Sequence, residues 1–192
     1  MFRDIRQQCY VSIFLFLAAV FLYCIYSQAA GLTWQFDDRI NLSGLANASN
    51  WQGLRDFLFG GIAGPSGRSI ALLSFLPNYS DWPGNPWGMV RSALIWHAMN
   101  AFLVFMLARI LLIQRYSAGS ALWMAAFVAV IWAALPIHAS GLLMPVQRMV
   151  HVSAFFVLGG LVSFCYLRIC FAGSQGLVAS ALMFFVLLQV KQ

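Results

Sequence analysis

Long apolar runs dominate this sequence and limit what it can fold into. Apolar residues make up 62% of the 192 residues and charged residues only 8%, whereas charged residues are about 25% of ordinary soluble domains. So few charged side chains cannot form the polar surface of a water-soluble protein. A soluble globular enzyme is therefore excluded, and so is a disordered chain. We expect an all-α, polytopic membrane protein.

The runs can be compared with the thickness of a bilayer, which a helix of about 20 apolar residues crosses. They are Cys9–Tyr26, Met89–Ile113, Ala121–Leu135 continuing into Gly141–Leu143, Val150–Phe171 and the shorter Leu177–Val190. We therefore predict four or five transmembrane helices in a single membrane domain, residues 1–192. Arg3 and Arg6 before the first run also fit a secretory signal. Because further spans follow, we interpret that run as an uncleaved helix.

Basic residues outnumber acidic ones, 11 against 5. In so apolar a chain we interpret the excess as membrane orientation and attraction to anionic lipids, not as nucleic-acid binding. The arginines that flank spans on one side are Arg3, Arg6, Arg109, Arg115 and Arg168. The positive-inside rule then places the N-terminus in the cytoplasm. Most of the opposing arginines belong to one long loop, which this rule governs poorly.

That long segment, residues 30–87, is the predicted first external loop. It contains every acidic residue except Asp4, interleaved with aromatic residues. Leu45–Phe59 is predicted to form an amphipathic helix capped by Ser49 or Asn50. A second such helix is predicted from Ser69 to a stop at Pro77. Helices of this kind lie in the plane of the membrane interface.

Three sets of polar residues in and next to this loop have the types needed for chemistry. Asp37 and Asp38 suit a general base or a metal ligand, or they simply solvate the loop. Arg68 presents the planar fork that binds phosphate, from a ligand or from a lipid headgroup. His97 and Asn100 share one face of the second span, where polar groups usually face protein or a water-filled cavity.

Further polar residues lie in the turn between the third and fourth spans. They are His138, Arg148 and His151. The predicted topology puts this turn on the same side of the membrane as the acid-rich loop. Convergence of acids with arginine and histidine at one face is a reasonable site hypothesis, although spacing alone does not name the reaction. The sequence has no Asp-x-Asp triplet and gives no support for a metal.

Several of these residues belong to short motifs in a recognisable order. The motifs are Phe36-Asp37-Asp38-x-x-Asn41, Gly67-Arg68-Ser69 followed by Asn78, Trp96-His97-x-x-Asn100, Pro136-x-His138 and Gln147-Arg148-Met149. In this order they resemble the N-terminal part of the GT-C membrane glycosyltransferases. The similar members are related to protein O-mannosyltransferases and to the transmembrane-and-tetratricopeptide-repeat mannosyltransferases.

The resemblance implies a partial GT-C fold and inverting transfer of a sugar from a polyprenyl-phosphate donor to a protein or glycan acceptor. The site would lie on the external face of a bacterial inner membrane, without an implied cofactor. Asp37 or Asp38 would be the catalytic base. The donor phosphate would be bound by Arg68, His97 and Arg148, with Asn100, His138 and His151 in support. Family members have more spans, so the chain resembles an N-terminal fragment. The alternative is a non-catalytic membrane interaction protein, a truncated or degenerate relative.

Overall fold

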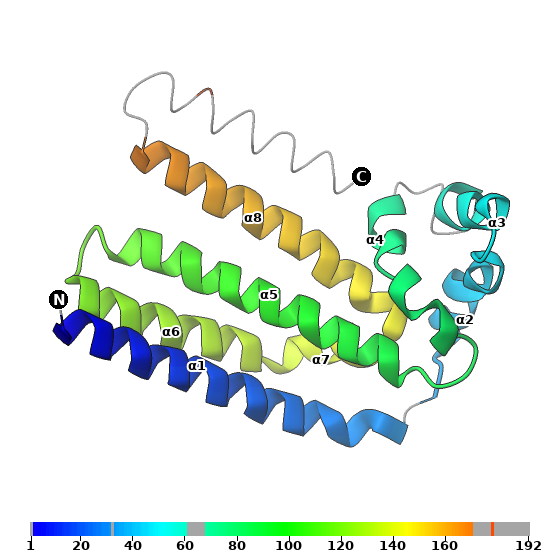
Figure 1. The fold of residues 1–192 in the computed structure, drawn as a ribbon, viewed down its shortest axis with the longest axis horizontal. Coiled ribbons are helices and arrows are strands. Elements are labelled where there is room, and N and C mark those ends of the chain that lie inside the picture. Colours follow the sequence, from blue (N-terminus) through cyan, green and yellow to red (C-terminus); the bar gives the residue numbers. More distant parts are fainter. Residues whose placement is uncertain (1, 32, 61–67, 171–177, 179–192) are drawn as a thin grey trace.

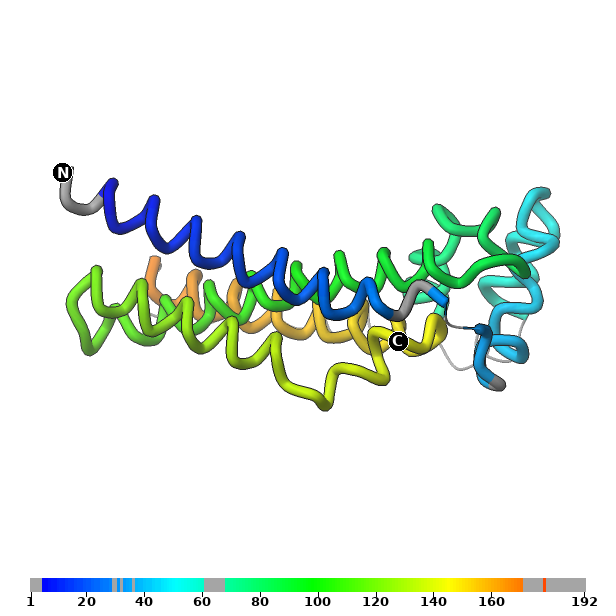
Figure 2. Tube along the Cα trace, turned by 90° about the horizontal axis from the view of Figure 1, so that it is seen from below, coloured from blue at the N-terminus to red at the C-terminus, as the bar shows by residue number. Residues whose placement is uncertain are grey.

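Four long helices lie side by side and alternate in direction: α1 (Phe2–Ser27), α5 (Trp87–Leu112), α6 (Ala118–Ala134) and α8 (Arg148–Cys170) (Figure 1). The computed structural model describes residues 2–31, 33–60, 68–170 and 178. All regular secondary structure in these residues is helical. The segments that join α1 to α5 and α6 to α8 lie at the same end of the helices (Figures 1 and 2). We call this the loop end.

Within the described residues, three helices are long and apolar enough to cross a membrane. A fourth span results if α6 and the following Pro136–Leu143, which meet at a bend of 50°, are counted together. The structure is therefore that of an all-helical, membrane-embedded protein, with helices at four of the five predicted spans. The fifth prediction, Leu177–Val190, falls almost entirely outside the described residues.

The bend after α6 has a local cause. Leu135 is extended, with φ −63° and ψ 129°, because a residue before proline is driven out of the helical region. The chain continues through two short helices, η5 (Pro136–His138) and α7 (Ala139–Leu143). The third predicted span is thus continuous in hydropathy but broken in the structure. After the break, the His138 ring lies against His97 and Trp132 at the loop end.

α6 packs against its neighbours through alanines. Ala121, Ala125 and Ala126 are fully buried, because small side chains allow two helix backbones to approach closely. α5 lies between α6 and α8 and contacts both extensively. α1 packs mainly on α6, and most of its surface is apolar and exposed, as expected for a helix that faces lipid.

The first loop is more broken than its hydropathy predicts. The predicted helix Leu45–Phe59 is divided into η2 (Ser43–Asn47), α3 (Trp51–Arg55) and the π turn η3 (Asp56–Gly60). As predicted, Asn50 caps the middle piece, accepting a hydrogen bond from the Gly53 backbone N–H at 2.7 Å. In one straight helix, Leu45 and Leu58 would lie on different faces. The breaks let both side chains enter the same buried cluster.

The second predicted loop helix also ends early. α4 spans Ser69–Leu73, and Ser74 follows with its hydroxyl donating to the Ala71 carbonyl at 2.6 Å. Pro77 lies inside the next short helix, η4 (Leu76–Asp81), where its missing N–H costs nothing. Pro77 is therefore not the stop signal. The shorter α4 leaves Phe75 free to turn into the core, where it is fully buried.

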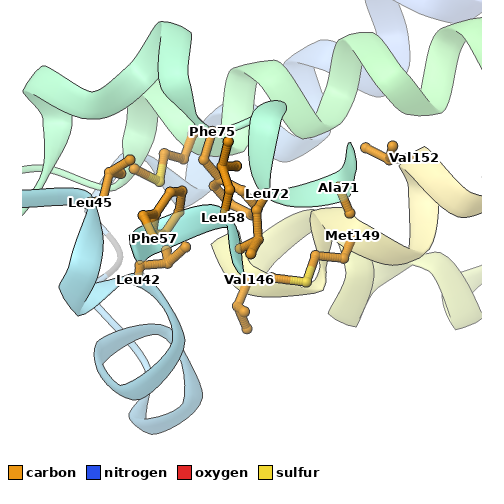
Figure 3. Packing of buried hydrophobic residues seen from close by; sticks show 11 residues of the cluster. Leu42, Leu45, Phe57, Leu58, Ala71, Leu72, Phe75, Val146, Met149 and Val152 are labelled. Carbon is orange, nitrogen blue, oxygen red and sulfur yellow. The ribbon is translucent and has the colours of Figure 1, made fainter. Parts of the chain in front are cut away.

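A hydrophobic cluster fastens the first loop to the start of α8 (Figure 3). Its buried members, which we call the loop core, are Leu42, Leu45, Phe57, Leu58, Ala71, Leu72, Phe75, Met89, Val146, Met149 and Val152. They come from α2 (Phe36–Leu42), from the later loop helices, from the start of α5, and from η6 (Pro145–Gln147) and the start of α8. The loop core therefore fixes where the polar residues of the loop lie relative to α5 and α8.

The alanine packing of α6 gives a testable stability difference. We expect Ala125→Leu to lower the free energy of unfolding by about 1–3 kcal/mol, because the larger side chain overpacks a fully buried position. Val128→Leu, at an exposed position of the same helix, should have little effect. Unfolding of the purified protein in detergent micelles measures both. Equal stability of the two variants would contradict the close packing of α6.

Candidate functional site at the loop end

Asp38 is completely buried, and both of its carboxylate oxygens are used by the fold. Oδ2 accepts a hydrogen bond from the Gln35 backbone N–H at 2.8 Å, at the beginning of α2. Oδ1 accepts one from the Val146 backbone N–H, also at 2.8 Å, in η6 (Pro145–Gln147). One carboxylate therefore joins two connecting segments of the loop end at positions 108 residues apart in the sequence.

The electrostatics of Asp38 are a balance of opposing effects. Burial raises the pKa of this carboxyl above its ordinary value, and the negative charge of Asp37 raises the pKa further. The hydrogen bonds from Val146 and Gln35 lower the pKa, because they stabilise the ionised form. A carboxylate held in this way positions the chain and is not open to a substrate.

Asp37 differs from its neighbour in being exposed. Its backbone carbonyl accepts a hydrogen bond from the Asn41 side chain at 2.8 Å within α2. Asp38 is anchored to η6, and helical geometry turns the Asp37 side chain about 100° away from that contact. The structure thus separates the two candidate acids, one buried in a clamp and one available to a ligand.

Arg148, the first residue of α8, is also completely buried. Its guanidinium lies over the Phe75 ring, with Cζ 4.0 Å from the ring centroid, an arrangement that favours a cation. Nη1 donates to Asn78 Oδ1 at 3.0 Å. Nε and Nη2 are buried and form no hydrogen bond with any residue that the structure describes. Two strong donors of a buried cation are therefore unused.

Asn78 organises a polar network around this guanidinium. Its Oδ1 also accepts from the Ser92 hydroxyl at 2.7 Å, and its Nδ2 donates to Asp81 Oδ2 at 3.1 Å. Gly88 allows the Asp81 carboxylate to approach α5 closely, because a Cβ at that position would overlap the carboxylate. Asn78 therefore lies between the Arg148 guanidinium and the Asp81 carboxylate in this network. Asn78 occurs in the sequence motif of the first loop, but its network with Asp81 depends on the tertiary structure.

Three histidines, from α5, η5 and α8, lie close together at the loop end. The ring centroid of His97 lies 4.9 Å from that of His138 and 5.2 Å from that of His151. Trp132 stacks on His97 at 5.3 Å with an interplanar angle of 21°. His97 Nε2 lies 3.0 Å from the Ala133 carbonyl oxygen. The sequence predicts these histidines at one face of the membrane, but nothing in it indicates the stacking tryptophan.

Asn100 and Arg68 complete the set of predicted site residues. Asn100 is buried and donates to the His151 backbone carbonyl at 2.9 Å, which joins α5 to α8. Arg68 is exposed and precedes α4 as its N-terminal flanking residue. In the described part of the chain, no group of three or more histidine, cysteine or acidic side chains has the geometry to hold a metal ion.

The structure therefore brings together some predicted site residues and separates others. His97, His151 and Asn100 are buried, and the half-buried His138 lies against the two other histidines. The backbone contact of Asp38 lies two residues before Arg148. Asp37 and Arg68 remain exposed.

Comparison with protein-family profiles, characterised proteins and solved structures found no match for this chain.

The two hydrogen bonds of the Asp38 carboxylate, which we call the clamp, predict that substitutions of Asp38 and Asp37 change the stability of the protein differently. We expect Asp38→Asn to lower the free energy of unfolding by about 1–3 kcal/mol, because an amide group leaves one of the two buried backbone N–H groups without an acceptor. Asp37→Asn, one residue away and exposed, serves as the control and should unfold like the wild type. Chemical unfolding in micelles compares them, and similar losses in both variants would contradict the clamp.

Gly141 gives a second stability test, centred on the histidines. A Cβ at Gly141 would lie 2.7 Å from His151 Nε2, so the buried imidazole would have to move. We expect Gly141→Ala to destabilise the protein by about 1–3 kcal/mol. Gly159→Ala is the matched control, because a Cβ there meets nothing within 4 Å. Thermal unfolding should rank the control as equal to or more stable than the wild type, since alanine favours helix; a destabilised control would remove the steric explanation.

Proposed function

We propose that the protein is an inverting glycosyltransferase, or its N-terminal part, that uses a polyprenyl-phosphate sugar as donor. The observation that carries the proposal is the buried Arg148, whose Nε and Nη2 have no hydrogen-bond partner among the described residues. Buried polar groups without partners are rare and call for an explanation. An anionic phosphate in this region would supply the missing acceptors.

The exposed Asp37 is the proposed general base. Asp37 follows the first span, and its neighbour Asp38 is hydrogen-bonded to the segment that leads into Arg148. A base therefore lies on an element anchored beside a phosphate-binding cation. This pairing of an available carboxylate with a cation supports transfer from a sugar phosphate.

The proposed reaction balances as a single displacement. A hydroxyl oxygen of the acceptor attacks the anomeric carbon of the sugar, and its proton moves to the Asp37 carboxylate. The bond between the anomeric carbon and the phosphate oxygen breaks, and its electron pair leaves with the lipid phosphate. Because attack and departure occur on opposite faces of the sugar, the configuration is inverted. Arg148 and Arg68 stabilise the charge that develops on the departing phosphate.

Under this proposal His97, His138 and His151 support the donor side of the site. Asn100 fixes α5 against α8 through the His151 carbonyl and so holds the histidines in place. The acceptor is a protein or a glycan outside the cytoplasm. The arginines of the short loops favour an N-terminus inside the cell, and the proposal has the loop end on the external face of a bacterial inner membrane. We propose that the four long helices are the first spans of a GT-C fold.

One observation favours a non-catalytic membrane interaction protein instead. Asp38 satisfies a helix start and a loop backbone, and Arg148 lies against Phe75 and Asn78. Both residues thus have a structural use that needs no substrate. The two functions make different predictions for Asp37, whose exposed side chain forms no hydrogen bond or ion pair with the described residues.

The activity test therefore centres on Asp37. Membranes containing the protein are incubated with radiolabelled polyprenyl-phosphate sugars and an acceptor extract, and label in the acceptor fraction is counted. Asp37→Asn should reduce transfer by about 10²–10⁴-fold, the usual contribution of a general base. Asp56→Asn, an exposed acid elsewhere in the same loop, is the control and should retain full transfer. Wild-type transfer in the Asp37 variant would show that Asp37 is not the base, whereas no transfer by the wild type would favour the non-catalytic alternative.

A further inference from the structure

An apolar cavity of about 460 Å³ lies between α1, α5 and α6. We call it the α1–α5 groove. Alanines form much of its wall, including Ala19 of α1, Ala98 and Ala101 of α5, and Ala129 and Ala133 of α6. The groove exists because these side chains are too short to fill the space between α1 and α5, which both pack on α6.

The groove has the dimensions and the setting of a site for a lipid chain. Its α5 wall extends from Arg91 to Phe105, which is about 21 Å of helix at 1.5 Å per residue. That is about two thirds of the 30 Å hydrocarbon core of a bilayer. α1 and α5 both have the length and hydropathy of transmembrane helices, so the groove lies among acyl chains and not in water.

One charged residue borders the groove, and it lies at the loop end. Arg91 is in the second turn of α5 and is exposed. It shares a helix face with Ile95, Ala98 and Phe102, which follow it along the groove at alternating spacings of four and three residues. No acidic side chain among the described residues forms an ion pair with Arg91. An unpaired guanidinium at the membrane interface attracts lipid phosphate.

We propose that the groove binds an anionic phospholipid of the surrounding bilayer, with one acyl chain along the alanine wall and the phosphate at Arg91. The proposal does not rest on the glycosyltransferase function. The bound chain would fill the space between α1 and α5 and hold α1 in place, because α1 otherwise packs mainly on α6.

The position of Arg91 on α5 favours a bilayer phospholipid over the sugar donor. Arg91 and Asn100 are nine residues apart, about two and a half helical turns, and so project from opposite faces. Asn100 faces α8, where it contacts the His151 carbonyl. Arg148 begins α8, so Arg91 lies on the opposite face of α5 from the contact with α8. His97 is the candidate-site residue that borders the groove, and its Nε2 lies 3.0 Å from the carbonyl oxygen of Ala133, which also lines the groove.

Native mass spectrometry of the purified protein tests this assignment. The probes are phosphatidylglycerol and phosphatidylcholine with identical acyl chains, supplied in equal amounts. The wild type should retain phosphatidylglycerol with about tenfold preference, and Arg91→Gln should abolish the preference, a change that corresponds to about 1.4 kcal/mol. Arg91→Lys should restore part of it. Arg55→Gln, which removes an exposed arginine of the same loop end outside the groove, should bind like the wild type.

A second variant tests the groove separately from the charge. Ala98→Phe places a large side chain in the groove from an exposed position and should reduce retention of both phospholipids, while size-exclusion and circular dichroism profiles remain those of the wild type. Equal retention of the two lipids by the wild type, or unchanged preference in Arg91→Gln, would overturn the proposal. Polyprenyl phosphate displacing phosphatidylglycerol from the wild type but not from Arg91→Gln would overturn it in favour of a donor site.

Discussion

A buried carboxylate connects the two halves of the loop end. Asp38 has no solvent exposure, and its charge is stabilised by backbone N–H groups of Gln35 and Val146. Removing a charge from water costs several kcal/mol unless hydrogen bonds replace the lost hydration. The start of α2 and the segment before α8 must therefore be in place together. The loop core reinforces this contact with apolar burial, and the position of Asp37 follows from both.

The other buried polar groups are satisfied only in part, because Arg148 Nε and Nη2 and Asn100 Oδ1 form no hydrogen bond with the described residues. Arg148 lies against an aromatic ring and an amide, and Asn100 bonds a backbone carbonyl of α8. Each of these contacts joins elements that are distant in the sequence, and α5 has two faces of different character. One face carries Asn100 and its polar contact to α8. The opposite face carries Arg91 and the apolar groove.

Much of the fold and part of the site could be predicted from the residues alone. The positions of the described spans, the capping role of Asn50 and the gathering of His97, His138 and His151 at one end agree with their patterns of hydropathy and spacing. The breaks in the loop helices could not be predicted, because they depend on which apolar side chains must reach one distant core. The distinction between Asp37 and Asp38 was hidden for the same reason, since adjacent acids have identical intrinsic chemistry.

The sequence by itself determined that this protein is helical and membrane-embedded, because its many apolar residues leave helices in lipid as the stable solution for the backbone. It also placed the chemically capable residues near the ends of those helices. Only the tertiary structure decided which of them are free. The Asp38 carboxylate is buried and accepts a hydrogen bond from the Val146 backbone. The Arg148 guanidinium lies over the Phe75 ring. Short alanine side chains on three helices leave a groove beside Arg91. Such contacts join residues that are far apart in the sequence, and no local pattern encodes them.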